Sequence, residues 1–554
     1  MSQYSDKVWL KQYPDLIPAE IPVSPHQDLN SFLREVMAKF ASRPAFYFMD
    51  AKMTFSELDR YSDHFGAYLL NMGLKKGDKI ALMMPNIFQY PVALFGCIKA
   101  GLVVVNTNPL YTSHEMEHQF KDSGVVAILI AENFAFNLEK IIHNTHIKHI
   151  VVTGIGDMLG GIKGMMINFV VRKIKKLVPA YHLPGAISFK RALSEGKKMS
   201  LPPLQSSLDD VVILQYTGGT SGIAKGAMLT NGNLLANMQQ IRIIFLSVLK
   251  EGEEVGICAL PLYHIFAFTV NCLALLSLGC PSVLIVNARD IPTLIKEWKK
   301  YPISIFPAVN TLFNSLMNHP DFKTIDFSKL KLPIAGAMAL QKAVFDKWKK
   351  MTGSAIVEGY GLTETSPVAC VNPVDGSTRV GTVGIPVPST LVRIVDENGT
   401  EVPVGEVGEI QVKGPQVMKG YYNKPEETAR TIINGWLSTG DMGLMSEDGY
   451  FTLVDRKKDM ILVSGFNVYP NEIEDIAALH PKVLESAAIG VPNEKSGESV
   501  KLFVVKKDET LTEAELKKHF KEYLTNYKIP REYEFRSELP KTNVGKILRR
   551  ALKQ

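Results

Sequence analysis

A glycine- and hydroxyl-rich stretch, Gln215 to Gly226, carries the residue types that bind phosphate groups. It follows an apolar run, Val211 to Leu214, that predicts a buried strand, and it precedes Thr230, which suits a helix N-cap. Glycines let several backbone N–H groups approach one anion, hydroxyls add donors, and a lysine adds positive charge. We therefore expect a polyphosphate-binding loop made of Tyr216, Thr217, Gly218, Gly219, Thr220, Ser221, Gly222 and Lys225.

The spacing of this loop excludes a Walker A motif. That motif has a glycine directly before its lysine and a serine or threonine directly after it, whereas Ala224 and Gly226 flank Lys225. A Walker-type kinase or ATPase is therefore a poor fit. Taken alone, the loop also fits a surface connection of small polar residues.

Further clusters with chemical potential lie far along the chain. His264 follows a strand-like run among aromatic residues, and Gly359 to Thr365 combines glycines with a tyrosine, hydroxyls and a carboxylate. Asp441, the charged stretch Asp455 to Asp459, and Lys546 come later. An enzyme that uses a nucleotide needs oxygen ligands for Mg²⁺, a ring for the base, an acid for the ribose and a cation for charge developing at phosphorus.

The elements that must position these clusters alternate between strand and helix up to about residue 360, which predicts doubly wound parallel sheets. From about Thr382, short strands separated by turns such as Glu397-Asn398-Gly399 predict an antiparallel β unit. The charged stretch Asp455 to Asp459 is the candidate linker. The expected fold class is α/β, with a large N-terminal domain (1–454) of doubly wound sheets plus the antiparallel β unit, and a small mobile α+β C-terminal domain (455–554).

Composition describes a folded globular protein. The chain has 554 residues, of which 46% are hydrophobic and 21% charged, and its formal net charge is +6. That charge is small for the length and no aromatic-basic module or zinc spacing accompanies it, so no nucleic-acid partner is expected. The five cysteines form no C-x-x-C pair and indicate reduced core residues of a cytoplasmic protein.

Two segments bear on membranes. Residues 265–286 are nearly continuously apolar but are interrupted by polar residues and a proline, so we expect a buried helix and a strand rather than a transmembrane helix. Residues 161–179 repeat apolar residues at helical spacing beside the cations Arg172, Lys173, Lys175 and Lys176, which suits an interfacial helix. The alternative is an amphipathic helix packed on the core. The N-terminus lacks the pattern of a signal peptide, so secretion is not expected.

With these motifs in view, the chain resembles the acyl-adenylate-forming superfamily, and within it bacterial long-chain fatty-acid–CoA ligases. The resemblance covers nearly the whole chain, from Val8-Trp9-Leu10 and Ala81-Leu82-Met83-Met84-Pro85-Asn86 through Asn434 to Asp441 and on to Gly545-Lys546-Ile547-Leu548-Arg549-Arg550. It implies two steps: a fatty carboxylate attacks the α-phosphorus of ATP, and coenzyme A then attacks the acyl-adenylate. ATP and coenzyme A are thus co-substrates, and Mg²⁺ is the implied cofactor.

The resemblance also implies roles for individual residues. Lys546 would serve the first half-reaction, although its C-terminal run of cations without an acid is otherwise typical of a solvated face. The implied catalytic residues are Lys546, Thr363, Glu364 and His264, and the metal ligands are Thr217 and Glu364. We expect His264 to position substrate rather than transfer protons, because the carboxylate arrives ionised.

For the nucleotide, the resemblance implies that Tyr360 stacks on adenine, that Asp441 takes the ribose hydroxyls, and that Thr363 approaches the α-phosphate. Arg456 and Lys458 would lie along ribose and phosphate. Beyond the loop, the implied ATP-binding residues are Gly336, Glu358, Gly359, Tyr360, Gly361, Asp441, Arg456 and Lys458. An acyl tail needs an apolar tunnel, for which the candidates are Phe266, Phe306, Val309, Leu312, Met338 and Val368, all equally explained as core.

In such a protein Asp455 is the implied hinge. The small domain would swing so that Lys546 leaves the site and Ser464, Gly465 and Phe466 arrive to admit coenzyme A. The expected setting is the cytoplasm with peripheral attachment to the inner face of the membrane through 161–179, and a homodimer is compatible with the sequence. Two other functions remain open: an adenylating enzyme that passes the acyl group to a carrier protein, and a non-catalytic sensor of lipid or nucleotide.

Overall fold

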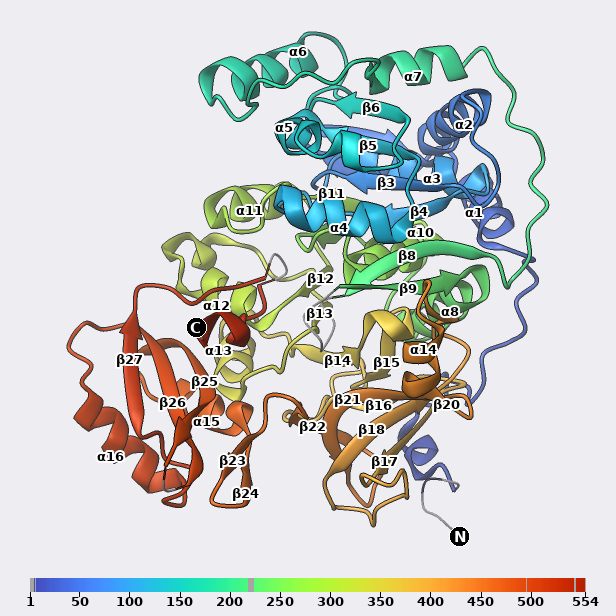
Figure 1. Ribbon diagram of the computed structural model, residues 1–554. Helices are drawn as coiled ribbons and strands as arrows, with labels where there is room; N and C mark the ends of the chain where they lie inside the picture. Colours follow the sequence, from blue (N-terminus) through green and yellow to red (C-terminus); the bar gives the residue numbers. More distant parts are fainter. Residues whose placement is uncertain (1–3, 5, 218–223, 495, 543–544, 554) are drawn as a thin grey trace.

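The computed structural model describes residues 4, 6–217, 224–494, 496–542 and 545–553. In this part of the chain the strands group into four sheets (Figure 1). Two large sheets with helices around them build most of the molecule, and an antiparallel sheet follows them. The fourth sheet belongs to the C-terminal region, which lies beside α12 and α13 in Figure 1. The predicted α/β fold class is confirmed.

The first large sheet has the strand order β7-β6-β5-β3-β4-β8-β9-β19. Strands β7 to β8 run parallel, whereas β9 returns antiparallel to β8 and pairs with β19. The central strands are apolar and buried on both faces, as a covered parallel sheet requires. The bounds are β3 Lys79–Met83, β4 Val103–Asn106, β5 Ala127–Ala131, β6 His149–Thr153, β7 Ile187–Ser188, β8 Val211–Thr217, β9 Lys225–Thr230 and β19 Gly420–Tyr421.

The second large sheet has the order β16-β15-β14-β13-β12-β10-β11-β1-β2. Its strands from β1 to β14 are parallel, and the outer strands β2, β15 and β16 are antiparallel to their neighbours. The bounds are β1 Pro44–Phe48, β2 Ala51–Thr54, β10 Gly256–Cys258, β11 Ser282–Leu284, β12 Ile305–Ala308, β13 Leu332–Ala335, β14 Val357–Gly361, β15 Val368–Val371 and β16 Ile385–Pro386.

Helices surround these sheets and connect their strands. Thr230 caps α8 as predicted, because its hydroxyl accepts the Asn233 N–H at 3.2 Å. The bounds are α1 Leu29–Lys39, α2 Phe55–Asn71, α3 Gln89–Lys99, α4 Ser113–Ser123, α5 Ala135–Glu139, α7 Phe189–Gly196, α8 Asn231–Leu246, α11 Ile291–Trp298, α12 Asn310–Asn318 and α13 Lys342–Thr352.

The antiparallel sheet has the order β17-β18-β21-β20, with β22 paired to β21, and α14 (Pro425–Thr431) precedes β20. The C-terminal sheet has the order β24-β23-β26-β25, with β27 paired to β26, and carries α15 (Pro470–Ala478) and α16 (Glu513–Tyr523). The bounds are β17 Leu391–Val395, β18 Gly408–Lys413, β20 Ile432–Ile433, β21 Trp436–Met445, β22 Phe451–Arg456, β23 Ile461–Val463, β24 Phe466–Val468, β25 Val483–Asn493, β26 Gly497–Lys506 and β27 Glu532–Arg536.

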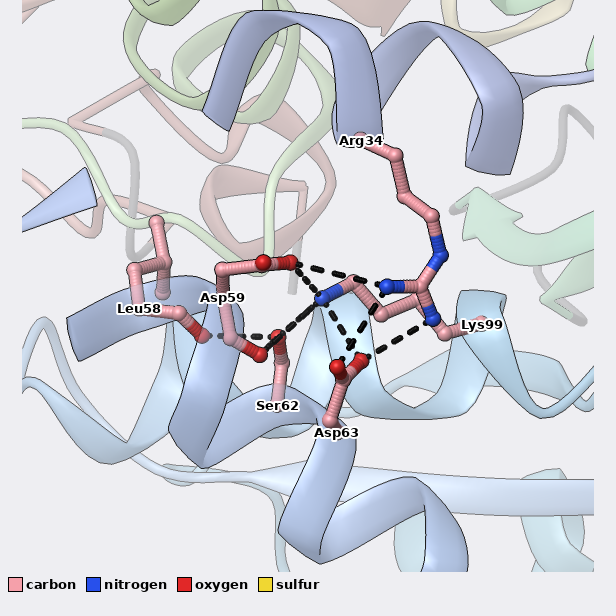
Figure 2. Close-up of polar contacts among 6 residues, drawn as sticks. All are labelled: Arg34, Leu58, Asp59, Ser62, Asp63 and Lys99. Atoms are coloured by element: carbon pink, nitrogen blue, oxygen red, sulfur yellow. Dashed lines mark hydrogen bonds and ion pairs between the residues drawn. The ribbon is translucent and has the colours of Figure 1, made fainter. Parts of the chain in front are cut away.

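A charged cluster joins α1, α2 and α3 inside the N-terminal part (Figure 2). The side chain of Lys99 is fully buried, and its ammonium pairs with Asp59 and lies 2.9 Å from both Ser62 Oγ and Asp63 Oδ1. Arg34 of α1 closes the cluster at 3.1 Å from Asp63. The carboxylates of Asp59 and Asp63 therefore share two cations, the buried ammonium of Lys99 and the half-exposed guanidinium of Arg34.

Residues 161–179 begin with α6 (Gly161–Phe169), which continues into a π-helical turn, Val170–Ile174. Its apolar stripe points away from the protein, so the alternative of a stripe packed on the core is wrong. The run 265–286 forms the helical pieces α9 (Ile265–Ala267), Phe268–Ala274 and α10 (Leu275–Ser277) and then β11, as predicted. Within the described residues, no helix combines the length and apolar character needed to cross a membrane.

Candidate active site

One cavity of about 1270 Å³ lies where the two large sheets, the antiparallel sheet and the C-terminal region meet. It collects residues that are far apart in the chain. The predicted site residues that line it are Tyr216, Thr217, Lys225, His264, Gly336, Glu358, Gly359, Tyr360, Gly361, Thr363, Glu364, Asp441, Asp455, Arg456, Lys458 and Lys546. Gly218, Gly219, Thr220, Ser221 and Gly222 were also predicted and lie outside the described residues.

The end of the cavity predicted to hold phosphate is built on a β-hairpin. Thr217 ends β8 and Lys225 begins β9, and the two residues are register partners. Lys225 thus belongs to a strand rather than to the loop. Its ammonium pairs with Glu427 of α14, and its side chain is only 10% exposed.

Glu364 lies on a 3₁₀ turn, Thr363–Thr365, directly after β14. Its Oε1 accepts a hydrogen bond of 2.8 Å from the Tyr421 hydroxyl. Glu364 and Thr217 offer the hard oxygen donors that Mg²⁺ prefers. In the described part of the chain no three acidic, histidine or cysteine side chains are arranged to hold a metal ion. A magnesium ion with these two ligands would need phosphate oxygens or water for the rest of its coordination, which is its usual mode of binding.

At the end of the cavity predicted to hold the nucleoside, three polar side chains, Tyr360, Asp441 and Arg456, are linked to one another. The Tyr360 hydroxyl donates to Asp441 Oδ2 at 2.8 Å, and Arg456 Nε lies 3.3 Å from Asp441 Oδ1. Asp441 and Arg456 are register partners in β21 and β22, so the sheet itself fixes this ion pair. Burial raises the pKa of Asp441, and Arg456 opposes that shift.

Two of the predicted glycines are places where a side chain would not fit without movement. A Cβ on Gly361 would lie 1.8 Å from the Pro367 carbonyl oxygen, and one on Gly336 would lie 3.0 Å from Phe266. Glu358 is buried beside them and accepts the Leu340 N–H at 3.0 Å. Burial raises the pKa of Glu358 to about 8, which favours the protonated carboxyl at neutral pH.

Lys546 reaches the cavity from the C-terminal region. Its N–H donates to the Thr542 hydroxyl at 3.0 Å, and the Thr311 hydroxyl of α12 donates to the Gly545 carbonyl at 3.2 Å. Burial and then repulsion from Arg456 lower the pKa of Lys546 to about 8, although Asp441 attracts its charge. The Lys546 ammonium therefore lies close enough to Asp441 and Arg456, at the end predicted to hold the nucleoside, for their charges to shift its pKa.

His264 is the N-cap of the short helix α9, and its Nδ1 accepts the Phe266 N–H at 3.3 Å. Burial and then Lys546 lower its pKa to about 3. The ring is therefore neutral, and Nε2 carries the proton as a donor. A neutral donor near an ammonium suits the orientation of a carboxylate, and the positioning role of His264 stays a prediction.

Asp455 is buried where β22 leads into the C-terminal region. Its carboxylate accepts the N–H groups of Arg456 at 2.7 Å and Asn471 at 2.8 Å, and Arg549 lies 3.6 Å away. Arg549 also donates to Glu474 of α15 at 2.8 Å. The end of β22, the start of α15 and the chain end that bears the lysine thus share one polar network.

Ser464, Gly465 and Phe466 are not brought to the cavity. Ser464 and Gly465 form the turn between β23 and β24, and Phe466, which begins β24, is 57% exposed and stacks on Tyr527. In this structure the C-terminal region therefore presents Lys546 to the cavity and the predicted coenzyme A residues to solvent.

Sequence reasoning missed Tyr421, Glu427 and Arg549. Proline at the first position of α14 with acids behind it signals a helix start, but not the contact of Glu427 with Lys225. It also missed that side chains of α8 line the cavity. The apolar residues that line the cavity include Ile241, Ile244, Phe245, Phe266, Val270, Met338, Pro367, Val368, Val371 and Val374. Among the earlier tail candidates, Phe306, Val309 and Leu312 are buried and do not line the cavity.

Comparison with known proteins agrees with this geometry. The family model for the AMP-binding enzyme matches residues 33–422, and the model for the AMP-binding enzyme C-terminal domain matches residues 472–546. A long-chain-fatty-acid–CoA ligase of Yersinia pestis is 53% identical over 549 residues, which cover 99% of this chain and 98% of that protein. The ligase of the same name from Bacillus subtilis (strain 168) is 39% identical over 552 residues, 99% of this chain and 98% of that protein. Among solved structures, the anthranilate CoA ligase AuaEII in complex with anthranoyl-AMP has a TM-score of 0.85 and 26% identity, covering 96% of this chain and 97% of that one.

Proposed function

The chain belongs to the family of AMP-binding enzymes, and from this we propose that it is an ATP-dependent ligase that converts long-chain fatty acids to acyl-CoA thioesters. The reaction passes through an acyl-adenylate and releases pyrophosphate and then AMP. The observation that carries this proposal is the convergence of Thr217, Glu364, Asp441 and Lys546 on one cavity that apolar side chains also line. A nucleotide and an acyl chain have room there together.

In the first half-reaction a carboxylate oxygen forms a bond to the α-phosphorus and the bond to the pyrophosphate oxygen breaks. The Lys546 ammonium stabilises the negative charge that gathers on the α-phosphate oxygens, and His264 orients the carboxylate. Asp441 and Tyr360 hold the nucleoside, with Arg456, Lys458, Thr363, Glu358 and the glycines around it. Mg²⁺, held by Thr217 and Glu364, would neutralise phosphate charge when bound.

In the second half-reaction the thiol sulfur of coenzyme A forms a bond to the acyl carbon, and AMP leaves with the electrons of the broken carbon–oxygen bond. We assign the turn at Ser464, Gly465 and Phe466 to coenzyme A, which requires the unit 455–554 to rotate against 1–454. Asp455 is the proposed hinge, because it lies at the junction and a few backbone angles there can absorb the rotation. The exposed position of the turn is compatible with this exchange.

The first test measures AMP and thioester formation with butyrate, octanoate, palmitate and oleate. We expect AMP and acyl-CoA in equal amounts, and kcat/KM at least roughly tenfold higher for palmitate than for butyrate, because each buried methylene contributes about 0.8 kcal/mol. Release of ADP instead of AMP would contradict the proposal. Acyl transfer to a carrier protein but not to coenzyme A would favour the carrier-dependent enzyme, and the absence of pyrophosphate exchange would favour a sensor.

We also propose that residues 161–179 attach the cytoplasmic enzyme to the inner face of the membrane. The side of α6 that meets the protein is small and polar: Gly164 is in close contact with Gly156, and Asn168 donates to Asp157 at 2.9 Å. Arg172 pairs with the buried Glu132 at 2.7 Å. The apolar residues that face outward, each more than half exposed, are Ile162, Met165, Met166, Phe169, Ile174 and Leu177.

This orientation is the reverse of an ordinary surface helix, in which the apolar side packs on the core. Lys163, Lys173, Lys175 and Lys176 are exposed beside the apolar residues, and residues 161–179 contain no acid. An apolar face flanked by cations matches an anionic lipid surface. Attachment there would bring the enzyme to a layer in which its long-chain substrates accumulate.

The membrane proposal is tested by co-sedimentation with vesicles of phosphatidylcholine and phosphatidylglycerol. Changing Met166 and Phe169 to glutamate is expected to lower the vesicle-bound fraction at least roughly tenfold. The matched control is Val23→Glu, because Val23 is a single apolar residue that is 96% exposed outside the segment. Equal sedimentation of the double variant and the wild type would contradict the proposal.

A further inference from the structure

Tyr421 touches two groups of the predicted phosphate end, and no motif pointed to it. Its hydroxyl donates to Glu364 Oε1 at 2.8 Å. Its ring lies beneath the Lys225 ammonium, 5.5 Å from Nζ to the ring centroid. One side chain therefore connects the carboxylate expected to ligate Mg²⁺ with the lysine expected to meet the β- and γ-phosphates.

The backbone around Tyr421 is tied to both of these residues. In β19, Tyr421 is the register partner of Ala227 in β9, the strand that Lys225 begins. The Met418 N–H donates to the Glu364 carbonyl at 2.8 Å, and the Tyr421 N–H donates to Thr428 at 2.9 Å. The ring is only 8% exposed. These bonds fix the ring and hydroxyl relative to both functional groups.

The charged groups around Tyr421 suit its contacts with both Glu364 and Lys225. The Tyr421 hydroxyl donates to the Glu364 carboxylate and leaves the other oxygen, Oε2, without a bond to this tyrosine. Lys225 has the Glu427 carboxylate as its ion-pair partner and the aromatic ring as a second contact. An ammonium over a tyrosine face is attracted by the ring and keeps its hydrogen-bond donors free for an anion.

We propose that Tyr421 is a positioning residue for the polyphosphate of ATP, in which the hydroxyl aims Glu364 at the metal ion and the ring seats the Lys225 ammonium. This inference rests on the proposed function. A residue that only fills the core would act through its ring alone, and the hydroxyl would then be dispensable. The two parts of the side chain can be removed separately, which makes the distinction measurable.

The test measures equilibrium binding of ATP by titration calorimetry, with Mg²⁺ and with EDTA, and of AMP. Tyr421→Phe keeps the ring, so ATP binding in EDTA should stay within about twofold of the wild type, while the gain in affinity on adding Mg²⁺ should fall roughly tenfold. Tyr421→Leu also removes the seat of Lys225 and should weaken ATP binding in EDTA as well, by about three- to tenfold. AMP lacks the β- and γ-phosphates, so its binding should be unchanged in both variants.

The matched control is Tyr422→Phe, which removes the same atom from the next residue, whose ring lies beneath Lys79 instead. It should bind ATP like the wild type under all conditions. Wild-type Mg²⁺ dependence in Tyr421→Phe would overturn the inference, as would equal losses of AMP and ATP binding in Tyr421→Leu, which indicate general disruption. If the wild type itself binds neither nucleotide, the proposed function fails rather than this assignment.

Discussion

Replacing Lys546 by glutamine is expected to slow acyl-adenylate formation by about 10²- to 10³-fold, the usual effect of removing one preorganised electrostatic group from a reacting centre. Glutamine keeps the length and a hydrogen-bond donor but removes the charge. Thioester formation from preformed acyl-adenylate should remain near the wild-type rate, because Lys546 is not assigned to that step. Rapid-quench measurements of the two half-reactions, each supplied with its own substrate, test both statements.

The pH dependence provides an independent check. The pKa of Lys546 is lowered to about 8, so its ammonium is fully formed below that pH and is lost as the pH rises through it. Adenylate formation by the wild type should therefore decline above about pH 8, and the residual rate of the glutamine variant should lack this decline. The matched control is Lys541→Gln on the same tail, because Lys541 pairs with Glu485 at 2.7 Å. Equal losses in both half-reactions would contradict a role confined to the first.

Replacing Lys99 by methionine is expected to destabilise the protein by about 2–3 kcal/mol. Methionine fills the volume but leaves Asp59 and Asp63 with Arg34 as their remaining cation (Figure 2). Losing one partner of a fully buried pair costs about 3–5 kcal/mol, and we expect less because the carboxylates are 35% and 33% exposed. Urea unfolding followed by far-UV circular dichroism measures the change.

Two further variants separate loss of charge pairing from loss of packing. Arg34→Met removes the half-exposed cation of the same cluster and should cost less than about 1 kcal/mol. Adding Asp59→Asn to Lys99→Met removes one of the two carboxylates that then share Arg34 and should restore part of the stability. A loss below about 0.5 kcal/mol for Lys99→Met would show that the buried ammonium contributes little.

Much of the fold and of the candidate site could be predicted because it depends on local pattern. Strands such as β13 and β17 are apolar runs between turn signals, which is the local pattern from which strands are predicted. The motifs around Thr217 and Glu364 stand at or just after strand ends, where open α/β sheets bind ligands. The expectation that these motifs meet in one site came from the resemblance to the family, not from the order of the elements alone.

What could not be predicted depends on contacts between distant segments. Tyr421 lies in a short strand, and its sequence context predicts only a core residue. The pairing of β19 with β9 is what brings Tyr421 to Lys225 and Glu364. Helical spacing gave the apolar stripe of α6 but not the direction in which it faces. That direction follows from Gly164 and Asn168, whose close contacts fix the small, polar side of the helix against the protein.

Arg549 fixes the C-terminal tail, which bears Lys546, to helix α15. Three residues after Lys546, its guanidinium is bound to Glu474 of α15 and lies beside Asp455. If the proposed rotation of 455–554 takes place, Lys546 would therefore move together with α15 as one rigid body, and no helix or strand would have to unfold for it to leave the cavity.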